Sequence, residues 1–248
     1  MPKSYINQFE LIKALRHGEA VNFGELLSTV NRQVVLSKVR KSTTDLSYPE
    51  RILITEYAVE EENWSKMKEK DKDRIIELYA KLRQKPEKVV EELQAFQRNY
   101  PNVPAIYNYL SLCYQLTKQK EKYITIIFET AEKFPDYLFG KIALSEHYLN
   151  DGHYRKIPSL FENKFEIVQH FPPGTKVFHV SAVRSFYYTI GRYFVKAGKI
   201  EMAYKCWFLL YDLDKKNNMT AHLGEEIVLY EIGLLKTKFK RYSPNGIK

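Results

Sequence analysis

Apolar residues recur every three or four positions over most of the chain, which predicts a protein built from amphipathic α-helices. The segment EELQAFQRNYP carries this spacing and ends at Pro101, and TIIFETAEKFP carries it and ends at Pro135. In both segments an aromatic residue precedes the proline, which stops the helix. Between them, AIYNYLSLCYQL has the same spacing and the polar turn KQKEK follows soon after. The pattern predicts helical hairpins placed in series.

The two prolines are 34 residues apart, and a fixed spacing of this length indicates a structural repeat. A copy beginning at Pro104 has core positions on two helices: Tyr107, Leu110, Ser111 and Tyr114, then Tyr123, Ile127 and Ala131. A second copy begins near Arg184 and turns at Gly198, with core positions Tyr187, Ile190, Gly191, Phe194, Ala203, Trp207 and Leu210. The small residue of each first helix, Ser111 or Gly191, lets the paired helices approach closely.

These positions resemble those of the tetratricopeptide repeat (TPR) family. The resemblance implies an all-α fold: an α-solenoid of antiparallel helix hairpins, or TPR-like superhelix, with an N-terminal helical extension. A degenerate copy is expected from Asp71 to Pro101. A stretched copy is expected from about Leu138, its second helix starting near Pro158 and running on to the PPG sequence at 172–174. The segment HLGEEIVLYEIGLLKTKF is expected to be the final helix that covers the last apolar face.

Two regions are expected along the chain. Residues 66–248 form the TPR-like repeat domain, whereas residues 1–65 show no repeat pattern and are interpreted as an N-terminal helical cap or adaptor. Within that first region, ELIKALRHG (outside the residues that the structure describes) and FGELLSTVNRQVVLSKVR have helical spacing. The segment SYPERILITEYAVEEENW is expected to be another helix, with Ser47 as its N-cap and Pro49 in its first turn.

Composition and charge narrow the function only a little. The chain has 248 residues, is 44% hydrophobic and carries a formal net charge of +9. The cations are spread along the chain and concentrate at 32–41 and 236–248, where they also complement helix dipoles, so a solvated basic surface is favoured over a dedicated phosphate track. Cys113 and Cys206 lie in apolar helical stretches and are expected to be buried, reduced thiols. The N-terminus lacks a signal-peptide pattern and no apolar run is long enough to span a membrane, which predicts a cytoplasmic location.

The sequence offers little of what catalysis requires, and nothing in it argues for an enzyme. It contains no HExxH, GxSxG, P-loop or dinucleotide-binding motif. The pairs His147/His153 and His170/His179 lack the spacing of metal ligands on a helix and are interpreted as polar surface residues. The expectation is therefore a protein that is not an enzyme, with no catalytic residue, no metal and no cofactor.

The resemblance to the repeat family implies a concave groove lined by residues of the first helix in each hairpin. It nominates these groove residues: Asn108, Leu112, Gln115, Phe139, Ile142, Glu146, Leu149, Tyr188, Arg192 and Lys196. The earliest hairpin adds Arg74, Leu78 and Lys81. A polar, cationic and aromatic groove suits a partner peptide or helix that carries acids, because arginine makes charge-assisted hydrogen bonds to carboxylates.

The leading hypothesis is a non-enzymatic scaffold, adaptor or chaperone that holds a segment of another protein in this groove. The alternative is a nucleic-acid-binding helical-repeat protein that uses its basic, tyrosine-rich surface for phosphate contacts and base stacking. A third hypothesis, a bacterial secretion chaperone of the same repeat type, fits less well because such chaperones are commonly acidic and shorter. The sequence names neither the partner nor the oligomeric state.

Overall fold

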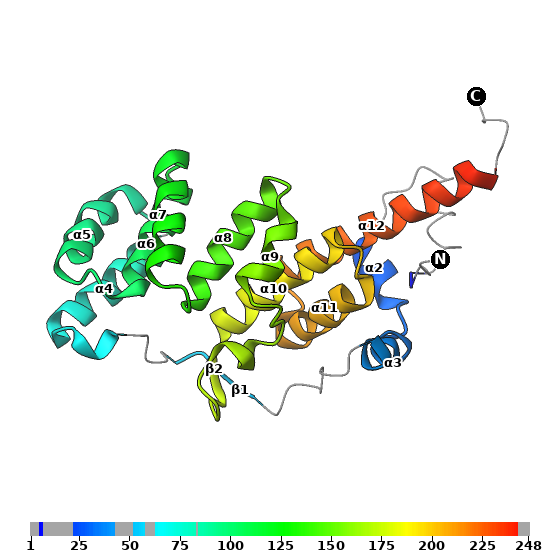
Figure 1. Ribbon diagram of the computed structural model, residues 1–248, viewed down its shortest axis with the longest axis horizontal. Coiled ribbons are helices and arrows are strands. Elements are labelled where there is room, and N and C mark those ends of the chain that lie inside the picture. The colour runs from blue at the N-terminus through cyan, green and yellow to red at the C-terminus, as the bar shows by residue number, and fades with distance from the viewer. Residues whose placement is uncertain (1–4, 7–21, 43–51, 58–62, 83, 243–248) are drawn as a thin grey trace. The chain divides into compact units, whose positions relative to one another are not determined.

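The computed structural model describes residues 5–6, 22–42, 52–57, 63–82 and 84–242, with the side chains of 40–42 and 235–242 excepted. Over these ranges the chain forms α-helices, three short 3₁₀ turns and two short strands (Figure 1). The helices pack against one another, which confirms the predicted all-α class. The chain forms two compact units. The central unit comprises 52–164 and 168–182, and the terminal unit comprises 1–51, 165–167 and 183–248.

The central unit is a series of helices in which each helix packs on the next one along the chain. Its members are α4 (Glu69–Leu82), α5 (Pro86–Asn99), α6 (Pro104–Leu116), α7 (Lys120–Lys133), α8 (Leu138–Asn150) and the single turn α9 (Ile157–Leu160). Proline occupies the first position of α5 and of α6, where its fixed φ suits a helix and its missing N–H is not needed. The helices predicted between 71 and 150 are present.

The backbone of the central unit repeats itself after 34 residues. Helices α6 and α8 both have 13 residues, and α8 begins and ends 34 positions after α6. Helices α5 and α7 end in the same way, since Tyr100 and Phe134 each have φ −128° and each donate a backbone N–H to the carbonyl four residues earlier. The period seen in the prolines is therefore a period of the backbone geometry.

The turn that follows each first helix also recurs. Lys118 and Gly152 both adopt the left-handed conformation, with φ of 58° and 77°. The residue after each of them donates its backbone N–H to the carbonyl of Tyr114 or Tyr148, over 2.9 and 2.7 Å. This bond is the mark of a helix closed by a left-handed residue. Gly198, with φ 71°, closes the third such helix in the same way.

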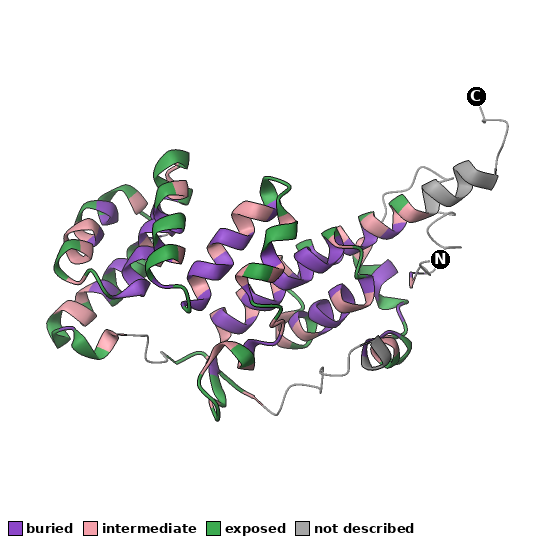
Figure 2. Cartoon of the chain, viewed as in Figure 1, coloured by how far each residue is buried: buried purple, intermediate pink, exposed green. Residues whose placement is uncertain are grey.

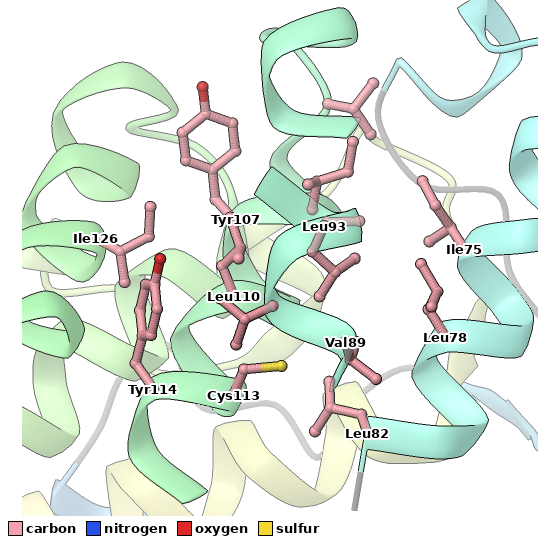
Figure 3. Close-up of a cluster of buried hydrophobic side chains, with 14 of the residues drawn as sticks. Ile75, Leu78, Leu82, Val89, Leu93, Tyr107, Leu110, Cys113, Tyr114 and Ile126 are labelled. Carbon is pink, nitrogen blue, oxygen red and sulfur yellow. The ribbon is translucent and has the colours of Figure 1, made fainter. Parts of the chain in front are cut away.

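The core of the central unit lies between consecutive helices. Leu110 and Cys113 of α6 point toward Val89 of α5 (Figure 3), and all three are buried. Helix α6 is buried along most of its length, whereas α7 alternates between buried and exposed faces (Figure 2). A helix enclosed on several sides is expected in the middle of a stack, where both neighbouring layers cover it.

One predicted helix is replaced by a strand. Leu53–Thr55 forms β1, which pairs in parallel with β2 (Val177–His179), Leu53 lying opposite Val177. The prediction of a helix through 53–55 is wrong, because the run ILIT is rich in β-branched residues that favour an extended chain and finds a partner strand far along the sequence. The proposed N-cap at Ser47 lies outside the described residues.

The second helix of the stretched repeat is also shorter than expected. Helix α9 ends at Leu160, and the chain continues through a short 3₁₀ turn (Ile167–His170) to β2. Glu162 and Asn163 both have positive φ, 54° and 59°, a conformation that interrupts a right-handed helix. The prediction of a helix running on to residue 172 is therefore wrong.

The terminal unit combines helices from the early and the late parts of the described chain. It contains α2 (Phe23–Ser28), α3 (Arg32–Ser42), most of α10 (Val180–Lys196), α11 (Ile200–Asp214) and α12 (Asn218–Tyr242). Helix α3 packs on α11 and α2 packs on α12. The single predicted helix over 23–40 is divided in two, because Asn22 and Asn31 each accept backbone N–H groups through their side chains and so begin separate helices.

Glycines allow the close approaches in this unit. A Cβ on Gly191 would lie 2.5 Å from Leu223 and 3.1 Å from the Cβ of Cys206, so the small residue noted in the sequence holds α10 against both later helices. A Cβ on Gly224 would lie 2.6 Å from Leu27 of α2. Helix α12 is thus covered by an N-terminal helix and is not the outermost layer expected from the sequence.

Candidate binding surfaces

The nominated groove residues fall in both units. Seven of them, from Asn108 to Leu149, lie on α6 and α8 of the central unit, and three, from Tyr188 to Lys196, lie on α10 in the terminal unit. On α6 and α8 they occupy matching places in the 34-residue period: Asn108 with Ile142, Leu112 with Glu146, and Gln115 with Leu149. The two helices therefore present the same positions in the same local geometry.

Exposure separates these residues into two groups. Gln115 is exposed, and Asn108, Leu112, Phe139 and Glu146 are partly exposed, although Leu112 and Phe139 also pack against the core of the central unit. Ile142 and Leu149 are buried, with 7% and 4% of their surface exposed. Of the central residues nominated from the sequence, these two act as packing residues in this structure.

The surface on α6 and α8 is polar and nearly uncharged. Asn108 and Gln115 carry amide side chains, each able to donate and to accept hydrogen bonds. Glu146 brings the one formal charge among the nominated central residues, and it lies near Tyr123, whose pKa burial and then this carboxylate raise to about 12. We call the surface formed by Asn108, Leu112, Gln115, Phe139 and Glu146 the α6–α8 surface.

On α10 the nominated residues are already engaged with α12. Tyr188 Oη lies 2.7 Å from Nδ1 of His222, and Arg192 Nε donates to Glu226 over 3.0 Å. Both pairs are separated by 34 residues, which is also the offset between the bounds of α6 and α8. Arg192 is 8% exposed and Lys196 is exposed. The guanidinium expected to meet an acidic partner instead forms an ion pair inside the terminal unit.

Arg74 of the earliest hairpin is likewise paired. Its guanidinium donates to Glu92 of α5 and to Glu77 of its own helix, at 2.7 to 2.9 Å, and these carboxylates raise its pKa. Leu78 is buried and Lys81 is exposed beside Glu77. The described arginines nominated from the sequence are therefore neutralised by neighbouring acids.

A buried ionic cluster in the terminal unit escaped the sequence analysis. Glu166 accepts a hydrogen bond from the ammonium of Lys205 and another, of 2.9 Å, from the hydroxyl of Tyr187. Each acid and base is 5% exposed, and burial, followed by the charge of Glu166, raises the pKa of Tyr187 well above 10. The cluster fastens the segment 165–167 to α10 and α11. The signal in the sequence was Lys205, a lysine placed just before the apolar run CWFLL of α11.

A second buried carboxylate, Glu231, receives the N-terminal segment. Both its oxygens accept the backbone N–H of Tyr5, at 3.1 and 2.9 Å, and Oε2 also accepts that of Ile6 at 3.2 Å. The hydroxyl of Tyr204 donates to Oε1 over 2.8 Å. Glu231 lies four positions after the buried Ile227, on the apolar stripe of α12. An acid on such a stripe needs hydrogen-bond donors, and this was the signal in the sequence for the contact.

A cavity of about 650 Å³ opens in the terminal unit between α2, α11 and α12. Trp207, Tyr211 and Phe23 supply aromatic walls, and Lys215 and Glu225 supply charge. The indole N–H of Trp207 donates to the carbonyl of Thr220 and is thereby fixed. The cavity has the size and lining to take an apolar side chain or a small aromatic group.

The described residues contain no group of three or more histidine, cysteine, aspartate or glutamate side chains placed to hold a metal ion. His170 lies 2.9 Å from the carbonyl of Lys164, and His179 lies 2.6 Å from the hydroxyl of Ser181. Cys113 and Cys206 are buried and unpaired with each other, and burial raises the pKa of both thiols. None of the described helices has the length and apolarity needed to cross a membrane.

No protein-family model, curated protein or solved structure matches this chain.

Proposed function

We propose that this chain is a non-enzymatic protein-binding scaffold, an α-solenoid of TPR-like hairpins whose α6–α8 surface holds an extended or helical segment of a partner. The observation that carries the proposal is the 34-residue recurrence of helix bounds and closing turns in the central unit. A regular stack of hairpins repeats the same backbone positions at a constant spacing, and a stack of this kind suits an extended or helical peptide segment as its ligand.

The chemistry of the surface favours a partner with an exposed backbone over an acidic one. The amides of Asn108 and Gln115 can pair with peptide N–H and C=O groups, and Leu112 and Phe139 offer apolar contact. The nominated arginines Arg74 and Arg192 are held by neighbouring acids. The expectation of an acid-bearing partner therefore rests on exposed lysines alone, and we propose an uncharged peptide segment in its place.

Site-specific photocrosslinking tests the proposal. A benzoylphenylalanine placed at Gln115 is expected to capture a protein segment from the organism's extract. The same probe at Glu129, exposed on α7, provides the matched control and is expected to capture far less. The captured segment, made as a labelled peptide, is then titrated by fluorescence anisotropy.

The double variant N108A/Q115A is expected to weaken that peptide's affinity by about tenfold, as the loss of one to two hydrogen bonds implies. The variant T125A/E129A on the exposed face of α7 is expected to leave the affinity unchanged. Equal crosslinking from both probe positions, or capture of RNA in place of protein, would overturn the proposal. Capture of RNA would favour the nucleic-acid-binding alternative.

A further inference from the structure

The surroundings of Glu231 have the features of a peptide-binding site. Its carboxylate is fully buried on α12 and is met by two consecutive backbone N–H groups, those of Tyr5 and Ile6. Successive amides that converge on one anion form the concave arrangement by which polypeptide backbone binds negative charge. Glu231 therefore binds the main chain of the docked segment, and any peptide of suitable shape has backbone N–H groups that could take this place.

Neighbouring side chains also contact the side chains of that segment. The hydroxyl of Tyr5 donates to Glu201 over 2.6 Å and accepts from Lys38 over 2.6 Å, and its ring meets Tyr204 edge to face at 5.6 Å. Burial, followed by the neighbouring Glu201, raises the pKa of this phenol, which keeps it neutral and able to donate. A phenylalanine in its place would lose both polar contacts.

The side chain of Ile6 is the third part of the segment that is bound, after its backbone and the phenol of Tyr5. Only 3% of its surface is exposed, so an aliphatic side chain of this size is enclosed next to the amide-binding carboxylate. Glu231 binds the backbone of the segment, and Glu201, Lys38 and Tyr204 contact the phenol of Tyr5. We call these four residues the Glu231 site. All four belong to the terminal unit, as does the segment that they hold.

The Glu231 site needs an occupant. Removing the segment strips the buried carboxylate of the N–H groups of Tyr5 and Ile6, and a buried acid that loses its donors is costly. Nearly 200 residues separate this dipeptide from Glu201, so the contact is one between distant segments of the chain. Any segment with two suitably placed backbone N–H groups could donate the same hydrogen bonds to the carboxylate of Glu231.

We propose that the Glu231 site is a peptide-binding site, occupied here by the chain's own Tyr5–Ile6, that accepts a partner segment with a tyrosine followed by an aliphatic residue. The site is separate from the α6–α8 surface and does not depend on the function proposed for it. A tethered segment acts at an effective concentration of about millimolar. The chain's own segment therefore excludes partner segments that bind the site weakly. A partner binds if its affinity is high enough to displace Tyr5–Ile6, or if Tyr5–Ile6 has already left the site.

The test uses the full-length chain carrying Tyr5→Ala and Ile6→Asp, which removes the chain's own side chains from the site. A fluorescein-labelled synthetic peptide of residues 1–21 is titrated by anisotropy against this variant and against the unaltered chain. The variant is expected to bind at least about tenfold more tightly, because no tethered competitor remains. A peptide with both substitutions is expected not to bind, and adding Glu231→Gln to the chain variant is expected to abolish binding.

Equal binding of the peptide by both chains, or binding by neither, would overturn the proposal. If the variant loses its helical circular dichroism, the unaltered sequence with 3-fluorotyrosine at position 5 alone supplies the measurement. Its fluorine resonance is expected to shift from the docked to the free position as unlabelled peptide is added to about 5 mM, several times the effective concentration of a tether. An unchanged resonance at that concentration would equally overturn the proposal.

Discussion

Lys118 and Gly152 occupy the same left-handed backbone position, one period of 34 residues apart, with φ of 58° and 77°. Glycine adopts this conformation without steric cost, whereas the Cβ of lysine crowds the following carbonyl. The α6–α7 turn is therefore strained where the turn after α8 is relaxed. We expect Lys118→Gly to raise the free energy of unfolding by about 0.5 kcal/mol, the relief of strain being partly offset by the freer unfolded chain.

The matched substitutions separate backbone strain from lost side-chain contacts. Lys118→Ala retains a Cβ and is expected to change the free energy of unfolding by less than about 0.5 kcal/mol. Gly152→Ala is expected to lower it by about 1 kcal/mol, although no atom lies within 4 Å of the new Cβ. Urea unfolding followed by circular dichroism measures all three. A destabilised Lys118→Gly chain would contradict the assignment of strain.

The buried pair of Lys205 and Glu166 leads to a second prediction. Lys205→Met leaves the carboxylate of Glu166 buried without its cation and is expected to cost about 3–5 kcal/mol. A triple variant, Glu166→Leu, Lys205→Met and Tyr187→Phe, removes the charges and the hydroxyl together. It is expected to recover most of the loss, because apolar packing often replaces a buried ion pair without penalty. Denaturant unfolding of the single variant, the triple variant and the original chain measures the three free energies of unfolding. A Lys205→Met chain as stable as the original would show that the pair contributes nothing.

Cys113 predicts a dependence of stability on alkaline pH. Burial, and then Glu87, raise the pKa of its thiol from 9.0 to about 11. The unfolded chain therefore releases this proton first, so the contribution of the thiol to stability is complete below about pH 9 and is lost as the pH rises to about 11. Comparing the unfolding free energy of the original and Cys113→Ala chains between pH 8 and 11 isolates the effect. The slope is expected to be smaller in the variant, and identical slopes would refute the assignment.

The contact between α2 and α12 can be tested with two glycines of α12. A Cβ on Gly224 would lie 2.6 Å from Leu27 and 2.9 Å from the indole nitrogen of Trp207, whereas one on Gly233 would meet nothing within 4 Å. We expect Gly224→Ala to cost about 1–3 kcal/mol through overpacking. Gly233→Ala is expected to add up to about 1 kcal/mol of stability, because alanine is the better helix former.

Thermal unfolding compares the two variants. Truncating Leu27 to alanine in the Gly224→Ala background is expected to recover part of the loss, since it empties the space that the new methyl group enters. Strictly additive effects of the two substitutions would argue that α2 does not press on α12 at this point.

The helices that the sequence predicted correctly are those with local signals. Pro101 and Pro135 end helices, Pro104 begins one, and the apolar spacing between them is regular, so these residues suffice to place α5 to α8 along the chain. The small residue Gly191 likewise marked the close approach of α10 to its neighbours. These features depend on residues near one another in the chain, which is where sequence patterns carry information.

What escaped prediction depends on distant residues. Leu53–Thr55 forms a strand by pairing with Val177–His179. Glu162 adopts a left-handed conformation, which cannot be predicted from its being a glutamate. Burial of Arg192 against Glu226 was hidden as well, because a polar side chain in a helix looks the same whether its partner is water or a carboxylate.

The packing of α2 on α12 has a consequence for the order in which the protein is made. Leu27 leaves the ribosome almost 200 residues before Gly224 does, and at about 5–20 residues per second the wait lasts roughly 10–40 s. During that time α2 and α3 lack the surfaces that bury them, while successive helices of the central unit emerge beside their own partners. The terminal unit is thus the later of the two to assemble, because α2 and α3 must wait for α11 and α12.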